Sequence, residues 1–150
     1  MRRSLAFALT IAVVALVSGC GDEALSKGEF VAKADAICTK YDKQLQALPK
    51  PKTIDDIGSL ADKAIPIFES GVGELKDLKP PDALRNDVQR WIALNERELD
   101  DFKALRDAAR EGDASKTQVL ATKISKQEQQ ADSLARQIGL KRCGTSSSPA

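Results

Sequence analysis

Apolar residues recur every three or four positions in four long stretches of the chain, separated by short segments that contain proline or glycine. This spacing places apolar side chains on one face of an α-helix. The stretches cover about residues 27–48, 53–78, 81–111 and 113–138, and no strand pattern competes with them. We therefore expect an all-α fold. Long helices joined by short turns favour a four-helix up-down-up-down bundle over residues 26–143.

The first helix has a well-marked start. Ser26 and Glu29 have the spacing of a capping box, and Leu25 and Phe30 flank it as a hydrophobic staple. Pro49 ends the helix, because proline cannot continue it. The expected apolar face consists of Phe30, Ala34, Ile37, Tyr41, Leu45 and Leu48.

Similar signals bound the other helices. Thr53 begins the second helix, and Pro81 suits the first position of the third. Gly112 ends the third helix, and Asp113 caps the fourth. Gly139 followed by leucine is typical of a Schellman ending. Residues 144–150 are expected to form a disordered tail.

The second helix contains a conflict. Pro66 lies in the middle of its apolar pattern, where proline removes a backbone donor and crowds the preceding turn. Gly71 and Gly73 weaken the helix further. We expect a kink or a break, which either forms a hinge or pocket wall or accommodates packing around Phe68.

Asn95 and Gln127 occupy positions where the apolar faces of the third and fourth helices point inward. A buried amide without a hydrogen-bond partner costs about 1 to 3 kcal/mol. Three interpretations are open: the two amides bond one another, they line a small polar pocket, or they lie at the edge of the apolar face near water.

The first 19 residues follow a different pattern. Arg2 and Arg3 precede an apolar run over residues 5–17, and Ser18-Gly19 follows it. This order is typical of an export signal, and the run is shorter than the roughly 20 apolar residues that span a bilayer. We expect residues 1–19 to be cleaved and residues 20–25 to form a short tether.

Val17-Ser18-Gly19-Cys20 resembles the bacterial lipobox, in which the cysteine receives a diacylglyceryl group and becomes the new N-terminus. The resemblance implies lipidation of Cys20. It also implies an anchor in the cell membrane with the chain on the extracytoplasmic face, since two acyl chains hold a protein stably. The alternative is an ordinary secretory signal with an incidental cysteine.

Cys38 and Cys143 remain as a pair, which in an oxidising compartment predicts a structural disulfide. The bond would close a loop of about 100 residues, for which the chain-entropy argument gives roughly 4 to 5 kcal/mol. A reactive thiol pair is the alternative, but Cys-x-x-Cys spacing and histidine are both absent. Because Cys38 lies well inside its helix, either that helix overhangs the bundle or residues 139–143 climb back along it, and we expect a mixture of the two.

Composition excludes several kinds of chemistry. The chain has no histidine, and its only methionine is Met1, so the usual ligands of catalytic, zinc, copper and haem sites are absent. The net charge of +1 becomes −1 when Arg2 and Arg3 leave, which gives no electrostatic case for a nucleic-acid partner. We expect no catalytic, metal or cofactor-binding residues.

The densest acidic cluster lies on the third helix and consists of Glu96, Glu98, Asp100 and Asp101. Oxygen ligands would suit calcium or magnesium. Arg97 and Lys103 interleave with the acids, so we interpret the cluster as a solvated face with ion pairs.

Several short segments of the exported part carry a looser resemblance: Ala-Asp-Ala-Ile-Cys at 34–38, Leu-Lys-Pro-Pro at 78–81, Trp91, Gly112-Asp113, and Gly-Leu-Lys-Arg-Cys-Gly at 139–144. Together they resemble small exported helical lipoproteins of uncharacterised function from bacteria such as actinobacteria. The resemblance implies a fold and a disulfide, and it implies no activity.

Two functions fit these observations. The first is an interaction or structural module of the cell envelope, which offers a helical face to an envelope protein and has no catalytic activity. The second is a lipoprotein that holds a small apolar or amphipathic molecule, of unknown identity, between its helices. A cavity near Phe68, Trp91 and Asn95 favours the second function. A solid core with an exposed apolar strip favours the first.

Overall fold

Four α-helices make up most of the protein. The computed structural model describes residues 23–145, and these contain no strand. The elements are α1 (Lys27–Gln46), α2 (Ile54–Lys76), a 3-10 turn (Asp82–Leu84), α3 (Arg85–Arg110) and α4 (Ala114–Ile138). The predicted all-α class is confirmed. The expected signal peptide over residues 1–19, the lipidation at Cys20 and tail residues 146–150 lie outside the described residues.

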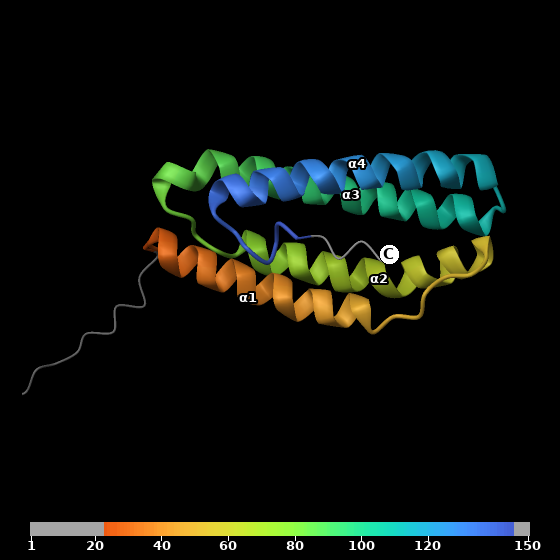
Figure 1. Ribbon diagram of the computed structural model, residues 1–150, viewed down its shortest axis with the longest axis horizontal. Helices are drawn as coiled ribbons and strands as arrows, with labels where there is room; N and C mark the ends of the chain where they lie inside the picture. The colour runs from red at the N-terminus through yellow and green to blue at the C-terminus, as the bar shows by residue number, and fades with distance from the viewer. Residues whose placement is uncertain (1–22, 146–150) are drawn as a thin grey trace, which may run out of the picture.

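The four helices lie along the long axis of the molecule (Figure 1). The links between α1 and α2 and between α3 and α4 lie at one end, and the link between α2 and α3 lies at the other. α3 packs against both α2 and α4, whereas α1 packs against α2. α1 is therefore the helix with the least support from its neighbours.

Side-chain caps fix the starts of α1 and α2, as the sequence predicts. The Ser26 hydroxyl accepts a hydrogen bond from the Glu29 amide at 3.3 Å, and the Glu29 carboxylate accepts from the Ser26 amide at 3.0 Å. Thr53 and Asp56 form an equivalent capping box on α2. Each box satisfies amide donors that the first turn of a helix leaves unpaired.

Two helix predictions differ from the structure in part. Of the kink or break expected at Pro66, the break does not occur, because α2 is continuous from Ile54 to Lys76. Asp62, whose carbonyl loses its donor to the proline, is exposed, so water can bond that carbonyl instead. Pro81 is not the first residue of an α-helix: it caps the 3-10 turn, and α3 begins after that turn. Such turns are common at helix N-termini.

The chain reverses at the end of α4 and returns along α1. Gly139 has a φ of +103°, and the Leu140 amide donates to the Ala135 carbonyl at 2.9 Å, which completes the predicted Schellman ending. Gly139 lies beside Lys27 near the start of α1. Residues 139–143 thus climb back along the first helix to reach Cys38, which is one of the two expected routes.

The buried side chains form two clusters. The larger cluster includes the fully buried Phe30, Trp91, Ile138 and Leu140. The smaller one contains Ala61, Ile65 and Leu99, and Phe68 and Phe102 pack against it. The rings of these two phenylalanines meet edge to face, with their centroids 6.0 Å apart. α1 contributes only Phe30 and Ala34 to the buried set. The second half of its apolar face is therefore available to line something else.

Candidate functional site

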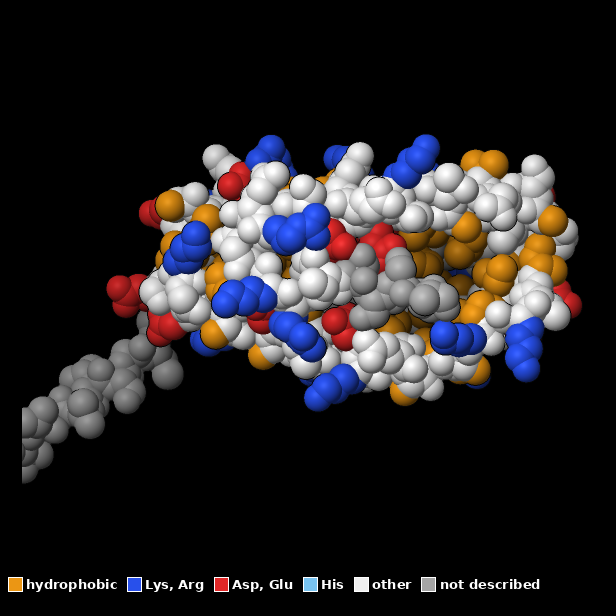
Figure 2. Space-filling model, in the orientation of Figure 1, with side chains coloured by type: hydrophobic (Ala, Val, Ile, Leu, Met, Phe, Trp, Pro, Cys, Tyr) orange, Lys and Arg blue, Asp and Glu red, His pale blue; other side chains and the backbone are white. Residues whose placement is uncertain are grey.

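An apolar cleft of about 610 Å³ lies between the second half of α1 and α4, and α2 and α3 also line it. Figure 2 shows hydrophobic side chains gathered in a hollow between these two helices, with acidic side chains beside them. Clefts of about 300 to 1,000 Å³ with mostly apolar walls are typical of small-molecule sites. The apolar lining includes Tyr41, Leu45, Leu60, Ala64, Phe68 and Phe102.

One wall of the cleft comes from the second half of α1. This wall stands close to α2 because Gly71 has no side chain: a Cβ there would lie 3.1 Å from the Tyr41 ring. The Tyr41 hydroxyl donates to the Glu74 carboxylate at 2.6 Å and holds the ring in place. The apolar stripe predicted for α1 thus divides into a buried part, at Phe30 and Ala34, and a part that lines the cleft.

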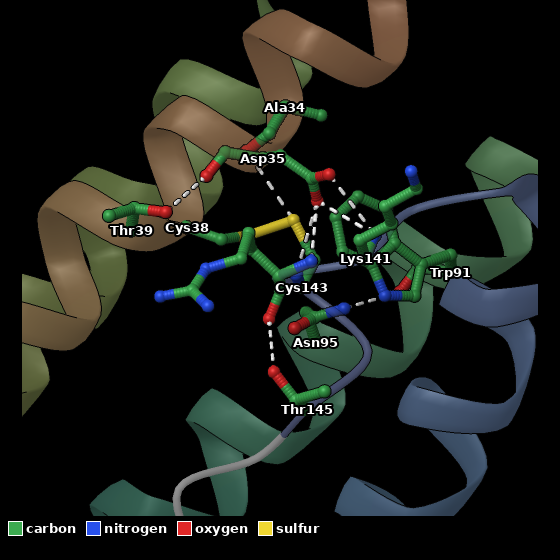
Figure 3. The surroundings of a disulfide bond; sticks show 10 residues. Ala34, Asp35, Cys38, Thr39, Trp91, Asn95, Lys141, Cys143 and Thr145 are labelled. Atoms are coloured by element: carbon green, nitrogen blue, oxygen red, sulfur yellow. Dashed lines mark hydrogen bonds between the residues drawn. A yellow bond between two sulfur atoms is a disulfide. The ribbon is translucent and has the colours of Figure 1, made fainter.

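The disulfide forms part of the lining of the cleft; Figure 3 shows its surroundings. Cys38 and Cys143 are bonded, with their Cα atoms 5.3 Å apart, and both line the cleft. The predicted disulfide is confirmed.

The neighbouring Asp35 holds the same segment in place. Its carboxylate accepts hydrogen bonds from the backbone amides of Lys141 at 3.0 Å and Arg142 at 2.8 Å. Sequence analysis gave Asp35 no role. The only signal was its position three residues before Cys38, which places both side chains on one face of α1.

Glu98 overturns the interpretation of the acidic cluster as a solvated face. Glu96 forms an ion pair with Lys76 at 2.6 Å, as expected of such a face. Asp101 forms an ion pair with Lys123 at 2.8 Å, but its side chain is only 14% exposed. Glu98, in contrast, is 8% exposed and lines the cleft. It lies seven residues after Trp91, a spacing that returns to the inward side of α3. The sequence held that signal, which the interleaved charges obscured.

Burial raises the pKa of Glu98 to about 8, and the nearby carboxylates of Glu128 and Asp132 raise it further in the same direction. Removal of a carboxylate from water disfavours its charged form, and like charges add to the effect. Glu98 therefore holds its proton at neutral pH.

The other charged residues of the cleft are arranged unevenly. Asp42, Glu128 and Asp132 are half-buried in its walls. Burial raises the pKa of Asp42, and the charge of Arg142 acts in the opposite direction. The basic lining residues among those described, Lys50 and Arg142, are both exposed at the rim. The interior of the cleft is thus acidic.

Asn95 and Gln127 do not share one role. Asn95 donates from its amide nitrogen to the Trp91 carbonyl at 2.8 Å and lines the cleft, which fits the polar-pocket interpretation for that residue. The side-chain oxygen of Gln127 is buried and has no hydrogen-bond partner among the described residues.

Residues 23–145 hold no group of three or more acidic, cysteine or histidine side chains placed to bind a metal ion. Within the same range, no helix has the length and apolar character needed to cross a membrane. Comparison with known proteins gave no match to a family model, a curated protein or a solved structure.

Proposed function

We propose that this chain is a lipid-anchored extracytoplasmic protein whose helical domain binds a small apolar or amphipathic molecule. The observation that carries the proposal is the apolar cleft of about 610 Å³. Phe68, Trp91 and Asn95 all line this cleft. A cavity near these three residues was the feature expected of a ligand-binding protein, whereas a solid core was expected of an interaction module.

The distribution of surface hydrophobic residues favours this function over an envelope interaction module. Among residues 23–145, Val119 is the one large hydrophobic side chain that is clearly exposed, at 65%. A face that docks a partner helix would present several such residues in a row. The accessible apolar surface is instead concentrated inside a concave site.

The up-down-up-down topology and the anchor belong to the same proposal. Links at alternating ends of the molecule favour an up-down-up-down bundle. The export signal and lipobox-like residues favour attachment through Cys20, and a disulfide between Cys38 and Cys143 suits an oxidising compartment outside the cytoplasm. The membrane is then a partner through the N-terminal lipid, and an envelope protein is a further possible partner.

The anchor is tested by the intact mass of the protein purified from its native membrane. We expect a chain that starts at Cys20 and carries acyl mass, and a Cys20→Ser variant released from membranes, because the acyl chains supply the affinity. An unlipidated mass, or membrane retention of the variant, would contradict the anchor and leave the cleft proposal untouched.

Ligand binding is tested through Trp91, the only tryptophan of the chain. A brominated dodecyl maltoside, used below its micelle concentration, should quench Trp91 fluorescence with saturation, because bromine quenches on close approach. Ala64→Phe places a ring in the cleft, and we expect it to weaken quenching about tenfold or more by excluding the alkyl chain.

Ala121→Phe is the matched control. Ala121 is exposed on α4 and does not line the cleft, so its replacement should leave quenching unchanged. Absence of saturable quenching in the natural protein, or equal quenching in both variants, would rule out the cleft as the binding site.

A further inference from the structure

We infer that the molecule held in the cleft is an organic cation with an apolar body, whose cationic group lies among Glu98, Glu128 and Asp132. This inference rests on the proposed function, since it names the chemical class of ligand for the same cleft. It is carried by the side chains that line the cleft and by their charges.

Glu98 is the first reason. Its side chain lies on α3 in the lining of the cleft and is more than nine-tenths buried. Within residues 23–145 it has no hydrogen bond and no ion pair, while Glu96 and Asp101 on the same helix each pair with a lysine. A carboxyl group this far removed from water is costly to ionise, and a bound cation would favour its charged form.

The surroundings of Glu98 are the second reason. From α4, Glu128 and Asp132 face it one helical turn apart, and Asp42 lines the α1 wall. α2 lines the cleft with apolar side chains and glycine only. The basic lining groups, Lys50 and Arg142, are exposed at the rim. A negatively charged ligand would meet repulsion at this depth, and a cation would meet attraction.

The form of the cleft decides between a metal ion and an organic cation. No three carboxylates among the described residues are placed to coordinate one metal ion, so the charge is spread over a wider volume. The rest of the lining is apolar and contains the aromatic residues Tyr41, Phe68, Trp91 and Phe102. Aromatic faces together with carboxylates are suited to alkylammonium groups, and the apolar walls are suited to an attached hydrocarbon chain.

Binding of a permanent cation should also displace the proton of Glu98. The charged groups that face Glu98 are Glu128, Asp132 and, across the cleft, Asp42, with Arg142 at the rim. A ligand that carries a fixed charge favours the ionised carboxylate, so a proton leaves as the ligand enters. The affinity for such a ligand should rise with pH between about 6 and 8.5.

The experiment compares three probes with one chain length on the full protein by titration calorimetry: dodecyltrimethylammonium, dodecyl maltoside and laurate, each below its micelle concentration. We expect the cation to bind about tenfold or more tightly than the neutral probe, and laurate to bind most weakly. Titrations in two buffers of different ionisation enthalpy should show proton release with the cation near neutral pH, and none with the neutral probe.

Two variants complete the test. Glu98→Gln should reduce the preference for the cation over dodecyl maltoside to about threefold or less and abolish proton release. Glu96→Gln, an exposed neighbour on the same helix, should change neither property. Circular dichroism of both variants confirms that they are folded.

The outcomes separate the two levels of the proposal. Equal binding of the cationic and neutral probes, or a cation preference that survives Glu98→Gln, would overturn the assignment of the cation site and leave ligand binding in place. Absence of binding by all three probes would overturn the proposed function itself.

Discussion

Replacement of both Cys38 and Cys143 by serine should lower the free energy of unfolding by about 4 kcal/mol, the scale expected for a crosslink that closes a loop of this length. The two cysteines are 105 residues apart in sequence. The loss should concentrate in α1, which fully buries only Phe30 and Ala34 and has α2 as its main helical neighbour. Denaturant unfolding followed by Trp91 fluorescence measures the total.

Hydrogen exchange locates the effect of the disulfide. Backbone amides of α1 should lose protection in the double variant at a lower free energy than those of α3, because the bond and the Asp35 contacts join α1 to residues 139–143. Reduction of the natural protein should reproduce the double variant. A loss below about 1 kcal/mol would show that α1 is held by its own packing. A uniform loss of protection in all four helices would show that the disulfide stabilises the bundle as one cooperative unit.

Replacement of Glu98 by glutamine should remove much of the pH dependence of stability between about pH 5 and pH 8.5. The pKa of Glu98 is raised to about 8 in the folded protein by burial and by Glu128 and Asp132, while an unfolded chain titrates near the ordinary value. Over this window the folded protein keeps a proton that the unfolded chain has released. Stability therefore falls as pH rises, and the full penalty is reached above about pH 8.

The size of the effect follows from the shift. Each pKa unit corresponds to about 1.4 kcal/mol of unfolding free energy. Between about pH 5 and pH 8.5 we expect the unfolding free energy of Glu98→Gln to rise by about 3 kcal/mol relative to that of the natural protein. This is less than the full shift gives, because water in the open cleft partly solvates the carboxylate. Urea unfolding of both proteins at several pH values provides the measurement. Glu96→Gln is the control, because Glu96 is exposed and paired with Lys76. Parallel curves for the natural protein and Glu98→Gln would show that Glu98 is hydrated and ionised in the folded state.

The buried Glu98 illustrates why the site was harder to predict than the fold. Helical spacing placed Glu98 on the inward side of α3, and its charged neighbours placed it in a solvated cluster. Both descriptions fit the same residues, because local sequence does not state whether a neighbouring helix covers a given turn. Asn95 on the same helix was noticed, since an amide among apolar residues is conspicuous, and it does line the cleft.

The apolar face of α1 shows the same limit. Its spacing was predicted correctly from Phe30 to Leu48, but only its first half is buried in the core. The second half lines the cleft together with residues of α2, α3 and α4. A stripe that faces a core and one that faces a cleft have the same period, and only the distance to the next helix distinguishes them.

The sequence by itself determined the all-α class, the capped starts of α1 and α2, the Schellman ending at Gly139 and the pairing of Cys38 with Cys143. Each of these depends on residues close together in sequence or, for the disulfide, on the two cysteines that remain once Cys20 is assigned to the lipobox-like segment. Only the tertiary structure decided that α2 continues through Pro66, that residues 139–143 return along α1, and that the helices leave an acidic, apolar-walled cleft. These features depend on how far apart packed helices come to rest, a distance set by side chains from all four helices together.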